Sequence, residues 1–180
     1  MSDETEYKNA ENKLLLLFLI EKMELPLSRS QITDYVQQAE FMDYYTLQQT
    51  LAEMVEGGYL EEASDSNNTR YSITGDGQTT LEYFEKHIPS SVRAMINSYI
   101  KEKRRDIKKD YETNATYFPN VENNEFIVKC GVYEDERALM EISVSVDTRD
   151  QARIIQTNWN SHAKVLYGKL IETLITPPDA

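Results

Sequence analysis

The stretch GGYLEEASDSNNTRYSITGDGQTTL, residues 57–81, decides the fold of this 180-residue chain. Tyr71 and Ile73 alternate with polar residues, which is the period-two pattern of a half-buried strand. We therefore expect a hairpin with strands over 59–63 and 70–74 and a polar tip between them. A further helix follows directly, because apolar residues then recur at helical spacing.

Helices are predicted before the hairpin. The first runs over about 11–23 and is apolar nearly all round at 14–20, which indicates burial on most sides. It ends at Leu25-Pro26, because proline disfavours a helical residue before it. Ser28 and Gln31 have the spacing of a capping box, which opens a second helix.

The second helix is expected to end near Gln38. Asp43 can cap a third helix, which runs to Glu56 and is stopped by two glycines. Three helices, a hairpin and a further helix in this order describe a winged helix-turn-helix domain over residues 1–89.

The rest of the chain has a different sequence pattern, in which one long helix is followed by strands. A long helix over 90–111 is expected to connect to a second domain over 112–180. Three strands there, separated by short turns, favour an antiparallel meander followed by a helix that ends near Ile175. The fold class is therefore α+β: an N-terminal winged helix-turn-helix, a long connecting helix, and a small C-terminal three-stranded antiparallel sheet plus helix.

The hairpin resembles the wing of bacterial transcriptional regulators of the PadR and MarR type. Their pattern is GYL, then Y-x-LT-x-x-G and a later Leu; the matching residues here are Gly58-Tyr59-Leu60, Tyr71, Ile73-Thr74, Gly77 and Leu81, with Ile73 replacing the usual Leu. The whole chain more closely resembles a bacterial family known as domain of unknown function 4364. That resemblance implies a winged helix joined to a small α+β part, and it implies no particular activity.

The third helix carries the candidate DNA-reading surface on the face opposite its apolar residues. The start of a recognition helix meets base edges, glutamine pairs with adenine, and Tyr and Thr hydroxyls suit phosphates. Further contacts are expected at the start of the second helix and at the hairpin tip. The candidate DNA-binding residues are Arg29, Tyr45, Thr46, Gln48, Gln49, Asn67, Asn68, Thr69 and Arg70.

The charge distribution opposes DNA binding. Residues 1–90 hold six Lys and Arg against seventeen Asp and Glu, a net of −11, whereas residues 91–111 hold seven against three, a net of +4. DNA affinity comes largely from cations that neutralise phosphates, and the third helix has none. The alternative is a winged helix that serves as a protein-interaction module without binding DNA.

The long helix is the expected dimerisation element, because one side is apolar and the opposite side is basic. A homodimer would place two recognition helices about 34–36 Å apart on double-stranded DNA. The alternatives are a helix packed on its own domain with a solvated basic face and, last, contact with a membrane surface. The candidate dimerisation residues are Val92, Met95, Ile96, Tyr99, Ile100 and Ile107.

The sequence favours a non-enzyme with no cofactor and no metal. His87 and His162 belong to no metal-binding pattern, Cys130 is the single cysteine, and no phosphate loop or nucleophile motif occurs. The longest apolar run is far shorter than the about 20 residues of a membrane span, so we expect no membrane partner and a cytoplasmic location. A sensor whose C-terminal part binds an unknown small-molecule effector is a further alternative.

Overall fold

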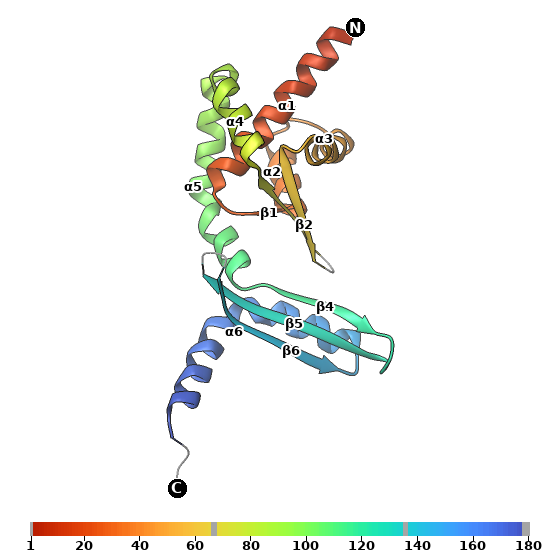
Figure 1. Cartoon of the computed structure of the whole chain (residues 1–180), viewed down its shortest axis with the longest axis vertical. Coiled ribbons are helices and arrows are strands. Elements are labelled where there is room, and N and C mark those ends of the chain that lie inside the picture. The colour runs from red at the N-terminus through yellow and green to blue at the C-terminus, as the bar shows by residue number, and fades with distance from the viewer. Residues whose placement is uncertain (1, 66–67, 135–136, 178–180) are drawn as a thin grey trace. The chain divides into compact units, whose positions relative to one another are not determined.

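The computed structural model describes residues 2–65, 68–134 and 137–177 as a mixed helix-and-sheet chain (Figure 1). Its elements are α1 (Ser2–Met23), β1 (Leu27–Ser28), α2 (Arg29–Gln38), α3 (Tyr44–Glu56), β2 (Leu60–Asp65), β3 (Asn68–Ile73), α4 (Gly75–Phe84), the 3₁₀ turn η1 (Glu85–His87), α5 (Ser90–Glu112), β4 (Ala115–Asn120), β5 (Glu125–Glu134), β6 (Arg137–Val146) and α6 (Arg149–Ile175). Two compact units divide within α5, between Arg105 and Asp106. The predicted α+β class is confirmed.

Two predicted helix caps are confirmed in the first unit. The Ser28 hydroxyl accepts a hydrogen bond from the backbone N–H of Gln31 at 3.2 Å, and the Gln31 side chain accepts one from the backbone N–H of Ser28 at 2.9 Å. Asp43 accepts from the backbone N–H of Thr46 at 3.0 Å at the start of α3. These caps satisfy amides that a helix leaves unpaired, so they fix where α2 and α3 begin.

The first sheet has three strands in the order β1-β3-β2, where the sequence predicted a two-stranded hairpin. The additional strand β1 pairs antiparallel with β3 in the register Leu27↔Tyr71 and Ser28↔Arg70. The predicted strand number is therefore wrong. A two-residue strand that directly follows Pro26 is too short to show the alternation by which strands are recognised.

α1 begins at Ser2, well before the predicted start near Glu11. The prediction rested on the apolar residues, which begin only at Leu14. The sequence before them is rich in acidic residues, and the helix macrodipole favours acidic residues near a helix N-terminus. The helix therefore extends beyond the segment that its buried residues define.

The core of the first unit is built around α1. Its residues 16–20 are each no more than 2% exposed, so the helix is covered on all sides there, as the all-round apolar pattern predicted. Helices α3 and α4 and strand β3 pack against it. The buried apolar residues contributed by other elements of this unit include Ile32, Leu47, Leu51, Met54, Leu60, Tyr71, Leu81 and Ile96.

The second unit is a three-stranded antiparallel sheet in the order β4-β5-β6, covered by α6 on one face. This arrangement matches the predicted meander and helix. Its buried cluster contains Val128, Cys130 and Val132 from β5 together with Ala152, Trp159 and Ala163 from α6. The Trp159 indole N–H donates to the Gly131 carbonyl at 3.0 Å, which ties α6 to the central strand.

The first turn of α4 passes so close to Tyr59, the residue before β2, that residue 77 must be glycine. A Cβ at Gly77 would lie 2.2 Å from the backbone carbonyl oxygen of Tyr59, whereas a Cβ at Gly75 would meet nothing within 4 Å. We expect Gly77→Ala to destabilise the protein by about 1–3 kcal/mol, the usual cost of overpacking. Gly75→Ala is the matched control. Urea unfolding followed by circular dichroism measures both, and equal midpoints for the two variants would contradict this account.

Candidate nucleic-acid interface

Two arginines that are far apart in the sequence lie at the corner where α2 begins. Arg29 is the first residue of α2, and Arg70 stands opposite Ser28 in the β1–β3 ladder. The Arg70 Nη1 group donates to the Pro26 carbonyl at 3.3 Å. Both arginines were predicted from the sequence as phosphate contacts. Their proximity was not predicted, because strand β1 was not predicted.

The Arg29 side chain is exposed and yet held in place. Its Nη2 and Nε groups donate to the Tyr71 hydroxyl at 2.8 and 3.1 Å, and its guanidinium carbon lies 5.9 Å from the Tyr71 ring centroid. The hydrogen bonds to Tyr71 raise the pKa of Arg29 above its ordinary value. Arg29 is thus an oriented, permanent cation at a helix N-terminus, which is the end of a helix that attracts anions.

The first turn of α3 presents two tyrosines. Tyr45 is 83% exposed and Tyr44 is 49% exposed, with their rings edge to face at a centroid distance of 5.8 Å. The Thr46 hydroxyl donates to the Asp43 carboxylate at 2.6 Å, and this hydrogen bond is the main cause of a lowered pKa of Asp43. Tyr45 therefore faces solvent as predicted, whereas the Thr46 hydroxyl is engaged in the helix cap.

The two predicted reading glutamines are placed differently. The Gln49 side chain is exposed, and its Nε2 group donates to Glu53 at 2.9 Å. The Gln48 Nε2 atom is buried and has no hydrogen-bond partner among the described residues. A base contact by Gln49 requires it to exchange Glu53 for the base, and one by Gln48 requires its side chain to turn outward.

Glu53 is the centre of a polar cluster that the sequence did not predict. Its carboxylate pairs with Lys13 of α1 at 2.7 Å and accepts hydrogen bonds from Gln49 at 2.9 Å and from Asn9 at 3.3 Å. These contacts, led by Lys13, lower the pKa of Glu53 to about 2. Lys13 thus compensates an acidic charge on α3, and the same ion pair engages the Lys13 side chain.

The hairpin tip is described only in part. Asn67 lies outside the described residues, and Asn68 is described by its backbone alone, as the first residue of β3. The Thr69 hydroxyl lies 3.2 Å from the Ser64 hydroxyl, in a hydrogen bond across the hairpin. Among the described residues of this hairpin, Arg70 carries the candidate phosphate contact.

The apolar side of α5, proposed for dimerisation, is largely used within the chain. Ile96, Ile100 and Ile107 are buried, Val92 and Tyr99 are half-buried, and Met95 is 45% exposed. The Tyr99 ring lies 4.3 Å from the ring of Tyr35, centroid to centroid. Little of this stripe is left for a partner, and dimerisation through it stays a prediction.

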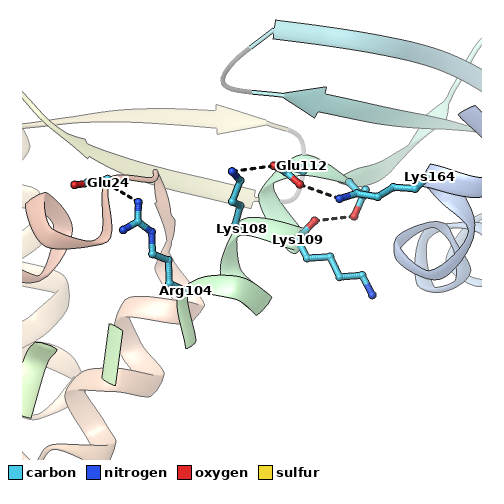
Figure 2. A network of polar contacts seen from close by, with 7 residues as sticks. Glu24, Arg104, Lys108, Lys109, Glu112 and Lys164 are labelled. Carbon is cyan, nitrogen blue, oxygen red and sulfur yellow. Dashed lines mark hydrogen bonds and ion pairs between the residues drawn. The ribbon is translucent and has the colours of Figure 1, made fainter. Parts of the chain in front are cut away.

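The basic side of α5 is partly compensated by carboxylates, as Figure 2 shows. Within the first unit, Arg104 pairs with Glu24. Within the second unit, Lys108 of α5 and Lys164 of α6 approach the Glu112 carboxylate at 3.4 and 3.1 Å. These ion pairs reduce the positive charge that this segment has available for a phosphate backbone.

The residues that often carry chemistry are dispersed. Cys130 is 3% exposed, and burial raises the pKa of its thiol to about 11, so it is not a thiolate at neutral pH. His87 and His162 are both exposed, and within the described ranges no group of three or more His, Cys, Asp and Glu side chains is placed to hold a metal ion. In the same part of the chain, no helix is long and apolar enough to cross a membrane.

Each unit also contains a hollow. In the first unit a largely apolar groove of about 420 Å³ is lined by α1, α3 and α4 residues such as Leu14, Met54 and Phe84. In the second unit a more polar hollow of about 290 Å³ on the sheet is lined by Thr116, Lys129 and other residues. Either is of a size that small molecules occupy.

Comparison with known families assigns the chain to one of them. The model of the family described as "Domain of unknown function (DUF4364)" matches residues 12–174. This chain belongs to that family. No curated protein and no solved structure matches it. The match spans both units of this DUF4364 protein. It includes the Arg29–Arg70 corner, α3 and all of α6 except its last residue.

The Glu53 cluster gives a pH dependence that can be measured. Because the pKa of Glu53 is depressed in the folded protein, its contribution to stability is present above about pH 4.5 and is lost as the pH falls towards 2. We expect Glu53→Gln to lower the melting temperature at neutral pH, with a cost of no more than about 1 kcal/mol for this accessible pair. The difference from the wild type should shrink as the pH approaches 2.

Glu56→Gln is the matched control, since Glu56 is an exposed carboxylate on the same helix with no such cluster. Melting temperatures of the three proteins between pH 2 and pH 7, followed by circular dichroism, measure the effect. Parallel profiles for the wild type and Glu53→Gln would contradict the linkage of α1 to α3 through this carboxylate.

Proposed function

We propose that this DUF4364 protein is a homodimeric DNA-binding regulator of the winged-helix type, with α3 in the major groove and the β2–β3 hairpin as the wing. The order of α1, β1, α2, α3, β2 and β3 supports the proposal, because it is the order of a winged helix-turn-helix domain. The motif that resembles the PadR and MarR wing lies in the same hairpin. The family match itself supports membership and carries no activity.

The observation that carries the proposal is the cationic corner of Arg29 and Arg70 at the N-terminus of α2. Phosphates are bound by arginine side chains and at the N-terminal ends of helices, and this corner places two arginines at the N-terminal end of α2. Arg29 is held there by a neutral hydroxyl rather than by a carboxylate, so its charge is not cancelled by its hydrogen-bond partner.

The reading helix supports base contacts at its exposed end. Tyr45 is the most exposed side chain of the first turn, and its hydroxyl suits a phosphate oxygen or a base edge. Gln49 carries the amide that pairs with adenine once it leaves Glu53. Glu53 itself is compensated by Lys13, which limits the repulsion between α3 and the duplex.

A second candidate function is a protein-interaction module on the same scaffold. The exposed Tyr44 and Tyr45 rings favour it, because aromatic side chains are enriched at protein interfaces. The strongly acidic composition of residues 1–90 also favours a protein partner over nucleic acid. This function makes no use of the Arg29–Arg70 corner.

A salt titration separates the two functions. The regulator is expected to bind duplex DNA at about 50 mM salt. The logarithm of its affinity should fall linearly with the logarithm of the salt concentration, with a slope of about −0.9 per phosphate contacted. Arg29→Ala and Arg70→Ala should each weaken binding to all sequences alike and reduce the slope by about 1. Fluorescence anisotropy with labelled duplexes measures both quantities.

Arg153→Ala is the matched control, since Arg153 is an exposed arginine of the second unit, 3.8 Å from Asp150. It should leave affinity and slope unchanged. Arg29→Lys separates charge from folding, because it keeps the cation while altering the hydrogen bonds to Tyr71, and it should keep the slope. The absence of binding at about 50 mM salt, or equal effects of Arg153→Ala and Arg29→Ala, would favour the protein-interaction module.

A further inference from the structure

The apolar stripe of α6 follows a spacing of 3, 4 and 4 residues that occurs twice in succession. Such an 11-residue repeat corresponds to about 3.67 residues per turn, close to the helical period, so the stripe stays on one side along the whole helix. The first set packs on the sheet of the second unit. Its members are Ala152, Ile155, Trp159 and Ala163.

The second set continues the same stripe without a cover. Leu166, Leu170 and Leu174 are 45%, 40% and 71% exposed, and the adjacent Ile171 is 41% exposed. Figure 1 shows the corresponding turns of α6 extending past the strands of its own sheet. Within the described part of the chain, the sheet covers the first set of the stripe and no element buries the second.

We propose that the second half of this stripe, residues Leu166, Leu170, Ile171 and Leu174, is the homodimerisation surface of the protein, where it packs against the same residues of a second copy. The interface is isologous: the two stripes face each other across a twofold axis. It lies on α6 and is distinct from the stripe of α5.

The local charge favours a second copy as the occupant. Over residues 164–175 the charged residues are Lys164, Lys169 and Glu172, so this segment is nearly neutral in a chain of net charge −12. Two copies can therefore meet here without bringing their acidic regions together. Two lysines are too few for strong attraction to an anionic membrane or to nucleic acid, which require a cationic face.

The size of the stripe also fits self-association. The four side chains together expose apolar surface on the order of 350 Å², comparable to the largest patch on a typical monomer. Two such patches with their flanking groups would bury roughly 1,000 Å², the lower end for specific interfaces. We therefore expect a dimer with a dissociation constant on the order of micromolar rather than a permanent one.

Sedimentation of the full chain without DNA tests the proposal. The wild type is expected to pass from monomer to dimer between about 1 and 100 μM. Leu170→Glu should weaken association about tenfold or more, because it places a charge in the centre of an apolar interface. Leu174→Glu should do the same at a more exposed site, where we expect the charge to disturb the fold less.

Val165→Glu is the matched control. Val165 is a neighbouring apolar residue of the same helical segment, 58% exposed, and it lies off the stripe. The Val165→Glu variant should dimerise like the wild type. The Arg29→Ala variant should also dimerise like the wild type. Failure of the proposed DNA binding, seen in the salt titration, is therefore distinguished from failure of the proposed dimer, seen in sedimentation.

Three results would overturn the proposal. The first is a wild type that stays monomeric up to about 100 μM. The second is a dimer that Leu170→Glu and Leu174→Glu leave intact, which would place the interface elsewhere. The third is a monomeric wild type that binds phosphatidylserine-containing vesicles and loses that binding in Leu170→Glu, which would assign the stripe to a lipid surface.

Discussion

The pairing of β1 with β3 is the constraint on which the first unit depends. It places Leu27 opposite Tyr71, and both side chains are almost fully buried. A two-residue strand contributes little by itself, so its neighbours hold it: its second residue, Ser28, is also the N-cap of the capping box, and Arg70 donates to the Pro26 carbonyl just before it. Because Tyr71 has its ring in the core and its hydroxyl on Arg29, the packing of the core also positions the cation.

Electrostatic pairing decides which cations of this acidic chain are available. Lys13 is taken by Glu53, and Arg104 by Glu24, so these side chains contribute little to a surrounding positive potential. Arg29 differs because its hydrogen-bond partner is a phenol. A DNA-binding surface on such a chain rests on few oriented charges rather than on overall basicity, and it is correspondingly sensitive to salt.

Local patterns in the sequence predicted what is local in the structure. The capping residues Ser28, Gln31 and Asp43 fixed the starts of two helices, and short turns between alternating strands gave the second sheet. Strand β1 and the Lys13–Glu53 pair could not be found this way, because each depends on residues about 40 positions apart that only the packed core brings together. The burial of the Gln48 Nε2 atom is likewise set by packing, whereas helical periodicity placed Gln48 only on the flank of α3.

The stripes of α5 and α6 show the limit of periodicity most clearly. Both helices repeat apolar residues at helical spacing, which indicates that one side is buried without indicating what buries it. On α5 most of the apolar stripe is covered by other parts of the chain, as the burial of Ile96 and Ile107 shows. On α6 the sheet ends before the stripe does, and the remaining leucines are exposed. The proposed self-association through α6 would therefore belong to the second unit, whereas the Arg29–Arg70 corner belongs to the first. Helix α5 contributes residues to both units, so the covered stripe of α5 and the exposed stripe of α6 differ in what their own surroundings leave open.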